Sequence, residues 1–526
     1  MVVMRASRAT RGWLSGLPSI LAIVASVPLC GCSDGTDRTA EILDAGPPPD
    51  ASPDEPLPSS CDVPERPAPL DHDSVVGNGT PASCTRDALA AAVATGGNVT
   101  FDCGAEPVTI PFGGEVLVSA DTIIDGGGLV TFDGGGTSRL LVADWQVSLT
   151  VIGLGFVRGL ATTTNGRDAR GAAILGGGRG ALSVFDCVFV DNAAGAVAEE
   201  KEEGGGAIFV NGGTLLIVGS TFRGNSGGLG GAVYNMLAGL TVVSSVFEGN
   251  WSNSAGGALM TDGASTYIVD GAPPGVIDLC GCRFSDNSGH TLGGAAYLFA
   301  YAPDEVVVNQ CLFERNSVLR DTNGAAGGGA LCPGNAPVRL ANSLFVDNHA
   351  DGEAGGLWCD SRNLTQVENC TFTRNSAGVA GTDGGYGGAI SGGNLAIRNV
   401  TIADNHAEAS GGGIFNPYGP VSLDDSILSG STAGNEWGLA QSCTDPMQGS
   451  HNLQWPAPSE QDIACTTDPI AAEPLLGELS DNGGPTMTMA LLAGSPAIDV
   501  GAGCLATDQR GLPRTGSCDL GAFEVQ

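Results

Sequence analysis

The sequence predicts an all-β chain that folds as a right-handed parallel β-helix with an N-terminal cap helix, and three observations favour this fold. Gly-Gly-Ala-aliphatic segments alternate with Phe-x-x-Asn segments through the middle of the chain. Successive repeat asparagines are 25 to 37 residues apart, and a unit this short cannot bury its own hydrophobic face, so the units must stack. Glycine supplies 83 of the 526 residues without a collagen period, as many tight turns require.

The repeat asparagine is the most regular position of this pattern. Stacked coils place like residues above one another, so each side-chain amide should hydrogen-bond to the coils on both sides and form an internal ladder. A ladder of phenylalanine rings should run beside it, with Ile402 in the last, degenerate copy. The predicted ladder consists of Asn192, Asn225, Asn250, Asn287, Asn316, Asn348, Asn375 and Asn405.

The hydrophobic alternation changes phase inside each repeat. In the first copy, Leu182 and Phe189 have opposite parity, so both can face the core only if the phase slips between them. The slip falls at Asp186 and predicts a one-residue bend. Most equivalent positions hold residue types that tolerate a left-handed backbone, whereas Ser244 and Gln310 fit less well. The better matches are Gly219, Gly281, Asn342, Asn369 and Asn399.

Residues 1–31 have the pattern of a bacterial secretory signal, and a tether follows. Three arginines precede an apolar stretch that two prolines interrupt and that is short for a membrane span. Positions 29–32 read Leu-Cys-Gly-Cys and resemble a lipobox, so we expect Cys32 to carry a lipid; an ordinary signal peptide is the alternative. Residues 32–60 are rich in Pro, Asp and Ser and lack apolar periodicity, as expected of an extended tether.

The rest of the chain divides into three parts. Residues 61–104 hold the first coil and a helix expected over residues 85–95, with Thr85 as its N-cap, which would cover the open end of the solenoid. Residues 105–431 hold the β-helix repeats, about a dozen coils in all. Residues 432–526 leave the repeat pattern and form a C-terminal module.

Sixteen cysteines in a chain with a secretory signal imply disulfide bonds. Cys332 and Cys359 hold the same position in successive repeats, and stacking would bring them to about 4.8 Å, within reach of a disulfide. Two further pairs are plausible because they are local, namely Cys443 with Cys465 and Cys504 with Cys518. The chain has no Cys-x-x-Cys pair, so a zinc site is not expected.

The charge balance excludes several classes of partner. The chain has 57 acidic against 22 basic residues, which gives a formal net charge of −35. Such a surface repels nucleic acid, anionic lipid and polyanionic sugars. We therefore expect no nucleic-acid partner, and membrane contact only through the N-terminal lipid.

Two stretches resemble known families of bacterial surface proteins. The Gly-Gly-Ala-Ile and Phe-x-x-Asn copies over residues 171–416 resemble the repeat pair of the polymorphic outer membrane proteins. In the tail, Asp-Asn-Gly-Gly-Pro-Thr at 481–486 and Cys-Asp-Leu-Gly-Ala-Phe-Glu at 518–524 resemble the choice-of-anchor Q module, which ends many surface β-helix proteins. These resemblances imply a cell-envelope location and, more weakly, adhesion. Because no C-terminal autotransporter barrel is recognisable, we expect Cys32 to supply the anchor.

The rival hypothesis is a polysaccharide lyase or a glycoside hydrolase on the same pectate-lyase-like scaffold. A lyase would need a basic residue beside an acidic calcium cluster, but the chain has a single lysine, Lys201, and its repeat arginines fall at shifting offsets. A hydrolase needs two carboxyl groups about 5–10 Å apart, and a chain with 57 acidic residues holds such pairs by chance. The sequence therefore names no catalytic residue.

Metal and cofactor sites are equally weak in the sequence. The histidines His349 and His406 both follow a repeat asparagine, but two coils separate them by about 10 Å, too far for one metal ion. Acidic residues that precede a repeat asparagine resemble turn residues, with structural calcium as a minor option. They are Asp191, Asp286, Asp347 and Asp404. No organic cofactor is expected.

These observations favour a non-catalytic cell-envelope protein, either an outer-membrane lipoprotein or a protein of the extracellular surface. Its expected role is adhesion, or binding of a glycan or another cell-surface partner along one face of the helix. A clustered Asp/Glu/Arg groove on one strand face would favour the enzyme, and a uniform face of Thr, Ser and Asn would favour the binding protein.

Overall fold

The computed structural model describes residues 60–162, 169–195, 203–265, 274–319, 327–359, 362–381, 384–434, 439–460 and 462–526. The predicted signal peptide, the lipidation site Cys32, nearly all of the tether at 32–60 and Lys201 lie outside the described residues. Within the described part, no helix is long and apolar enough to cross a bilayer.

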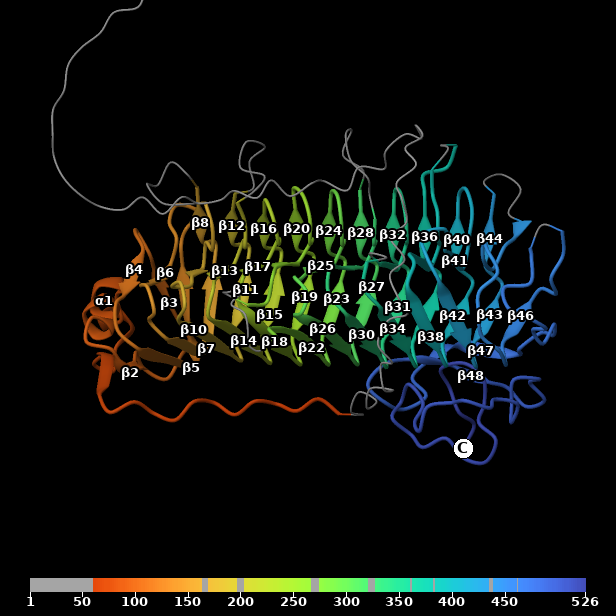
Figure 1. Cartoon of the computed structure of the whole chain (residues 1–526). Helices are drawn as coiled ribbons and strands as arrows, with labels where there is room; N and C mark the ends of the chain where they lie inside the picture. Colours follow the sequence, from red (N-terminus) through yellow and green to blue (C-terminus); the bar gives the residue numbers. More distant parts are fainter. Residues whose placement is uncertain are drawn as a thin grey trace, which may run out of the picture. The chain divides into compact units, whose positions relative to one another are not determined.

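The chain winds into a parallel β-helix of about a dozen coils, shown in Figure 1. Each regular coil contributes a strand, a bend, a second strand, a turn and two further strands, and like strands of successive coils pair in parallel. The strands before the bend are β10 (Ala181–Phe185), β14 (Thr214–Val218), β18 (Gly239–Val243), β22 (Val276–Cys280), β26 (Glu305–Asn309), β30 (Val338–Ala341), β34 (Thr365–Glu368), β38 (Leu395–Arg398) and β42 (Val421–Asp424). The strands after it are β11 (Val188–Val190), β15 (Thr221–Arg223), β19 (Val246–Glu248), β23 (Arg283–Ser285), β27 (Leu312–Glu314), β31 (Leu344–Val346), β35 (Thr371–Thr373), β39 (Thr401–Ala403), β43 (Ile427–Ser429) and β46 (Leu453–Trp455).

Two further sheets of eleven strands complete the coils. One contains β8 (Leu160–Ala161), β12 (Ala193–Ala194), β16 (Ser226–Gly227), β20 (Trp251–Ser252), β24 (Ser288–Gly289), β28 (Ser317–Val318), β32 (His349–Ala350), β36 (Ser376–Ala377), β40 (His406–Ala407), β44 (Thr432–Ala433) and β45 (Leu439–Ala440). The other contains β4 (Val116–Val118), β6 (Leu141–Ala143), β9 (Ile174–Leu175), β13 (Ile208–Asn211), β17 (Val233–Met236), β21 (Leu259–Asp262), β25 (Ala296–Phe299), β29 (Leu331–Gly334), β33 (Leu357–Trp358), β37 (Ile390–Ser391) and β41 (Ile414–Phe415).

The N-terminal end of the solenoid is irregular and closed by a helix. Its strands are β1 (Asp73–Gly77), β2 (Gly97–Asp102), β3 (Val108–Pro111), β5 (Thr122–Asp133) and β7 (Leu149–Val157), with a 3-10 turn at Pro81–Ser83. Helix α1 (Arg86–Val93) begins as expected after Thr85, whose side chain accepts a hydrogen bond from the Ala88 amide. Its buried residues Leu89 and Val93 face the first coil and cover the end of the core.

A left-handed residue stands at each bend between the two strands of the largest sheet. Asp186 has a φ of 53°, and Gly219, Gly281, Asn342, Asn369 and Asn399 also have positive φ. Ser244 and Gln310, which matched the predicted pattern less well, adopt the same conformation, with φ of 49° and 53°. The bend is therefore a property of the coil geometry, which imposes the left-handed backbone even on residues that disfavour it.

The repeat asparagines form a continuous hydrogen-bonded ladder inside the solenoid. The backbone amide and the side-chain amide of Asn225 both donate to the Oδ1 of Asn250, each at 3.0 Å. The same side chain donates to the carbonyl of Phe189 at 3.1 Å, in the preceding coil. This arrangement recurs through Asn375, which donates to Asn405 at the end of the ladder. Each buried amide thus has partners in the coils on both sides.

Stacked rings run beside the ladder. Phe345 lies 4.7 Å from Phe313 and 4.5 Å from Phe372 between ring centroids, and the planes are within 13° of parallel. The stack extends from Phe156 through Phe372, and Ile402 follows it as the next rung. All of these side chains are buried in the main hydrophobic core.

The predicted boundary of the repeat region at residue 431 differs from the observed strand pairing. Strand β44 pairs with β40, and β46 pairs with β43, so the coils continue to about the disulfide between Cys443 and Cys465. The chain then leaves the solenoid and forms the antiparallel pair β47 (Leu476–Ser480) and β48 (Thr488–Leu491).

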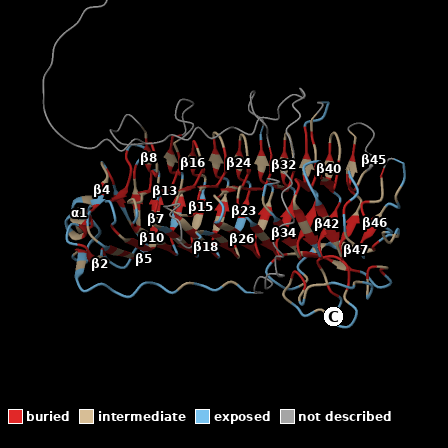
Figure 2. Ribbon diagram, viewed as in Figure 1, coloured by how far each residue is buried: buried red, intermediate tan, exposed pale blue. Residues whose placement is uncertain are grey.

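An extended segment, the N-terminal strap (residues 61–71), runs along the outside of the solenoid from the cap to its middle (Figure 1). A disulfide joins Cys61 to Cys280 on β22, with a Cα–Cα distance of 5.6 Å. An ion pair joins Arg66 to Asp186. Most strap residues are exposed (Figure 2), so the strap is held at a few points on the row of bends.

Candidate functional site

The C-terminal clasp, residues 471–526, folds back onto the outer face of the last coils. Gln509 accepts a hydrogen bond from the hydroxyl of Thr371 at 2.6 Å, and the Ala522 amide donates to the hydroxyl of Thr401 at 3.0 Å. These two threonines belong to neighbouring coils, so the clasp bridges successive rungs of one sheet.

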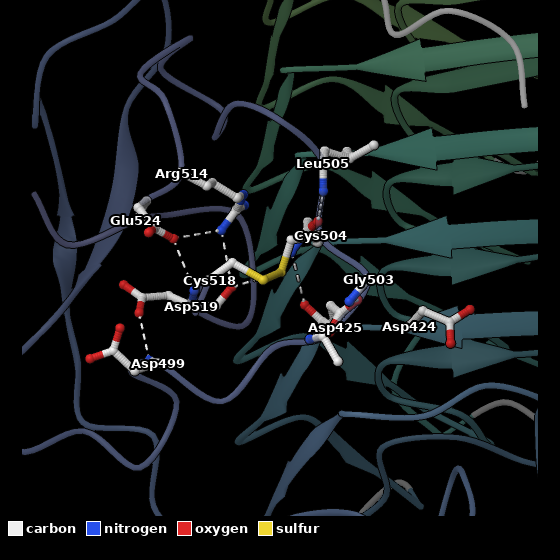
Figure 3. The surroundings of a disulfide bond; sticks show 12 residues. Asp424, Asp425, Asp499, Gly503, Cys504, Leu505, Arg514, Cys518, Asp519 and Glu524 are labelled. Atoms are coloured by element: carbon white, nitrogen blue, oxygen red, sulfur yellow. Dashed lines mark hydrogen bonds and ion pairs between the residues drawn. A yellow bond between two sulfur atoms is a disulfide. The ribbon is translucent and has the colours of Figure 1, made fainter. Parts of the chain in front are cut away.

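The clasp also binds the left-handed residues at the bends. The carboxylate of Asp425, which is only 1% exposed, accepts hydrogen bonds from the amides of Ala502 and Gly503 at 2.9 and 3.1 Å (Figure 3). The Leu505 amide donates to the side chain of Asn399 at 2.9 Å. The residue types that permit the bend thus also supply the polar groups that hold the clasp.

A buried polar network fixes the internal shape of the clasp. The Arg514 guanidinium donates to the carboxylate of Glu524 at 3.3 Å and to the side chain of Asn369 at 3.2 Å. Burial lowers the pKa of Arg514 and raises the pKa of Asp519 from their ordinary values. The disulfide between Cys504 and Cys518 closes the loop that carries Leu505 to the coil face (Figure 3).

A cavity of about 460 Å³ lies between this loop and the outer face of β34, β38 and β42. Its size lies within the range of small-ligand sites. The coil face contributes mostly polar side chains, and the clasp contributes a mainly apolar wall. The lining consists of Gln366, Glu368, Ala396, Ile397, Arg398, Ser422, Asp424, Cys504, Leu505 and Ala506.

Strand register places three charges of alternating sign along the cavity. Glu368 lies opposite Arg398, and Arg398 lies opposite Asp424 on the next rung. Rungs of a parallel sheet are spaced by about 4.8 Å, so the two carboxylate-bearing residues are about 10 Å apart with the guanidinium between them. Gln366 and Ser422 lie in the neighbouring row, on either side of Ala396.

Arg398 differs from most exposed arginines of the solenoid. Arg315 pairs with Asp286 at 2.8 Å, and Arg374 pairs with Asp347 at 2.8 Å. Among the described residues, the Arg398 guanidinium has neither an ion-pair nor a hydrogen-bond partner, although Asp424 lies on the adjacent rung. The Asp424 carboxylate instead accepts a hydrogen bond from the Ser450 amide at 2.9 Å. The cavity therefore holds a guanidinium whose donors are available to a ligand.

The structure also locates the predicted disulfide residues. It joins Cys443 to Cys465 and Cys504 to Cys518. Two further bonds, Cys61 to Cys280 and Cys84 to Cys103, were not predicted. The first spans 219 residues and leaves no local signal in the sequence. The second spans 19 residues, a local spacing like that of the two pairs that sequence reasoning did find.

The predicted pairing of Cys332 with Cys359 is corrected by the structure, in which neither belongs to a disulfide. Leu331 pairs with Leu357, so the same register places Cys332 opposite Trp358 rather than Cys359. The misalignment arises because Ala354 takes the left-handed position, with a φ of 56°, that glycine occupies in the other repeats. Matching the glycines of the two coils therefore shifted the alignment by one residue.

The other residues considered for chemistry lie in turns and on the surface. Asp191, Asp286, Asp347 and Asp404 all have left-handed backbones directly before the repeat asparagine, as turn residues do. His349 and His406 lie two rungs apart, with Ser376 between them. In the described ranges, no three His, Cys, Asp or Glu side chains gather closely enough to hold a metal ion.

The comparison with protein families supports the fold. A family model described as "Right handed beta helix region" matches residues 252–420. No curated protein matches the chain. Among solved structures, the crystal structure of pectate lyase Pel9A is similar, with 14% sequence identity and a TM-score of 0.33 over 82% of this chain and 88% of that chain. By the family model, the helix is a right-handed parallel β-helix, and neither match assigns an activity.

Proposed function

We propose that this protein is a lipid-anchored cell-envelope protein that binds glycans on the outer face of its β-helix without transforming them. The anchor would be the lipid on Cys32, joined to the solenoid by the tether at 32–60. The resemblances to the polymorphic outer membrane repeats and to the choice-of-anchor Q module support this location. The tether would connect through the strap to the middle of the solenoid at Cys280.

The observation that carries the binding proposal is the cavity with the Arg398 guanidinium, which has no ion-pair or hydrogen-bond partner in the described part of the chain. Hydroxyl-rich ligands need many hydrogen-bond partners, and charged donors and acceptors form the stronger hydrogen bonds. Gln366, Ser422 and the flanking carboxylates offer both donors and acceptors around Arg398. The net charge of −35 disfavours polyanionic sugars, so the expected ligand is a glycan without a high density of acid groups.

The test is a glycan-binding panel on the purified protein and two variants. Arg398→Gln should weaken binding at least tenfold, because it removes the charged donors from the cavity. Arg283→Gln is the matched control, since Arg283 is an exposed coil arginine that pairs with Glu314 away from the clasp. Equal binding by the wild type and both variants would place any glycan site elsewhere, and no binding on a broad panel would overturn the proposal.

The alternative, a glycoside hydrolase, is supported by one observation. Glu368 and Asp424 flank the cavity two rungs, about 10 Å, apart, just above the separation of the two carboxyl groups in inverting enzymes. A clustered Glu-Arg-Asp face is the feature that would favour the enzyme. We rank the binding function first because Arg398 stands between the two carboxylates, where the scissile bond would have to lie.

A depolymerisation screen separates the two functions. The non-catalytic protein should release no reducing ends and no unsaturated products from any polymer, with or without calcium. Turnover that disappears in both Glu368→Gln and Asp424→Asn would establish the hydrolase and displace the binding function.

A further inference from the structure

The charge pattern of the cavity indicates a ligand with charges of its own. Glu368, Arg398 and Asp424 alternate in sign on successive rungs, about 4.8 Å apart. An unpartnered guanidinium is best matched by a carboxylate, which can accept two parallel hydrogen bonds from it. Each flanking carboxylate is best matched by an ammonium group. The complementary ligand therefore carries a carboxylate with a positive group within a few ångströms.

The charge of the whole chain supports the same ligand class. With a net charge of −35, the protein repels a polyanion before it reaches the single guanidinium at Arg398. A polycation would be attracted to the whole acidic surface, and its binding would not be strengthened by the positive charge of Arg398. A zwitterion has no net charge, so long-range repulsion does not oppose its approach and the local pattern decides its binding.

The walls of the cavity fit a small group rather than a long charged chain. Ala396, Leu505 and Ala506 present apolar surface on the two sides of the charged row. Gln366 and Ser422 add neutral hydrogen-bonding groups in the neighbouring row. A volume of about 460 Å³ accommodates an amino acid or a short peptide together with one sugar ring.

We propose that the cavity recognises a zwitterionic amino-acid or short-peptide group, with its carboxylate on Arg398 and its ammonium on Asp424, one rung away. The inference deepens the proposed glycan-binding function and rests on it, because the group would be a substituent of the bound envelope glycan. It specifies which glycans bind, namely those that carry a free amino-acid or peptide end.

The test uses alanyl-alanine as probe, together with its N-acetylated and its C-amidated forms, by calorimetry on the full-length protein. The ends of an extended dipeptide are roughly 7 Å apart, which spans neighbouring rungs. The free dipeptide should bind, and blocking either end should weaken binding at least tenfold. Binding should also weaken with added salt, because the contacts are ionic and partly exposed.

Two variants test which side chain binds each end of the dipeptide. In Arg398→Gln, the free and the amidated dipeptide should bind equally weakly, because the partner of the carboxylate is gone. In Asp424→Asn, the partner of the ammonium is gone, so acetylating the N-terminus of the dipeptide should hardly change its affinity. Amidating the C-terminus should still weaken binding, because Arg398 is intact. Arg283→Gln should behave like the wild type. Unchanged thermal unfolding midpoints would show that the variants are folded.

The outcomes separate this inference from the proposed function. The inference that the cavity recognises a zwitterionic group would be overturned if the free and blocked dipeptides bound equally, or if none of them bound. This holds even if neutral oligosaccharides bind in an Arg398-dependent manner. In that case the glycan-binding function would stand without it. Absence of both dipeptide and oligosaccharide binding would overturn both.

Discussion

At the scale of single residues, the interior of the solenoid holds a row of small side chains beside the stacked rings. Cysteine and serine alternate irregularly in this row, and the Cys311 amide donates to the hydroxyl of Ser343 at 3.0 Å. Burial raises the pKa of the Cys187 and Cys370 thiols to about 12. Burial and contact with Cys282 raise the pKa of Cys311 well above its ordinary value. These thiols are therefore structural groups, unreactive while the protein is folded.

The row predicts a loss of stability at alkaline pH. An unfolded thiol ionises near pH 9, whereas the folded Cys370 stays neutral to about 12. Because the folded pKa is the higher one, this stability is complete below pH 9 and is lost as pH rises toward 12. Urea unfolding midpoints at pH 8 and pH 10.5 should therefore differ more in the wild type than in Cys370→Ser. Serine occupies the same row at Ser343, so the variant should fold. An identical pH dependence would show that Cys370 ionises freely in the folded protein.

At the scale of the repeating element, the asparagine ladder couples each coil to its neighbours through buried hydrogen bonds. Asn287 accepts from the backbone and side-chain amides of Asn250 and donates to Phe247 and Asn316. Because the rungs are linked in series, a defect in one rung leaves unsatisfied groups in two neighbouring coils. Buried polar groups without hydrogen-bond partners destabilise the fold, so the ladder enforces the register of the stack.

Asn287→Ala should lower the free energy of unfolding by roughly 3 kcal/mol, since buried amide donors of Asn250 and the carbonyl of Phe247 lose their partner. The measurement is urea denaturation followed by circular dichroism. Thr241→Ala on the outer face of β18 is the control, with an expected change below about 0.5 kcal/mol. Similar changes in both variants would mean that the ladder adds no stability beyond ordinary packing.

At the scale of the whole molecule, two segments from opposite ends of the chain attach to the same row of bends. The strap meets the row at Asp186 and near Gln310, where the Cys61 sulfur lies 3.5 Å from the Gln310 side chain. The clasp meets it at Asn369, Asn399 and Asp425. Strap and clasp thus cover one edge of the solenoid, and the cavity forms where the clasp loop overhangs the adjacent strands β34, β38 and β42.

The strap should depend on its disulfide. Loop-closure entropy for the 219 residues between Cys61 and Cys280 corresponds to about 5 kcal/mol in the chain-entropy estimate, against about 3 kcal/mol for Cys504–Cys518. The double variant Cys61→Ser/Cys280→Ser should therefore lower the thermal midpoint more than Cys504→Ser/Cys518→Ser. Limited proteolysis should cut the released strap between residues 61 and 71 while the coils stay intact. A strap that resists protease without its disulfide would be held by its other contacts alone.

The clasp should depend on Asp425. Asp425→Asn keeps a residue that tolerates the bend but replaces one carboxylate acceptor by a donor that faces the amides of Ala502 or Gly503. Hydrogen exchange of these amides should accelerate at least tenfold. Asp499→Asn, an exposed change in the same clasp, should leave their exchange unchanged. Equal exchange in the two variants would mean that the loop is held by Leu505 and the disulfide.

Most of the fold was predictable because it repeats. The bends and the asparagine ladder each depend on a few residues that recur at one position of the coil, so backbone preference and stacking suffice to locate them. The helix cap at Thr85 does not recur, but it is a local signal of the chain. The one-residue error at Cys332 and Cys359 has the same origin. An alignment made on glycine fails where Ala354 takes the left-handed position of a glycine.

The sequence by itself determined the repeating coil, its buried ladder and its acidic surface, since these follow from periodicity and composition. Only the tertiary structure decided which side chains meet on the outer face. The spacing from Glu368 to Arg398 is 30 residues and that from Arg398 to Asp424 is 26, because the intervening turns differ in length. The strap and the clasp likewise contact coils more than a hundred residues away. Such contacts depend on the winding of the whole chain and leave no local pattern, which is why the cavity and the charges in it could not be foreseen.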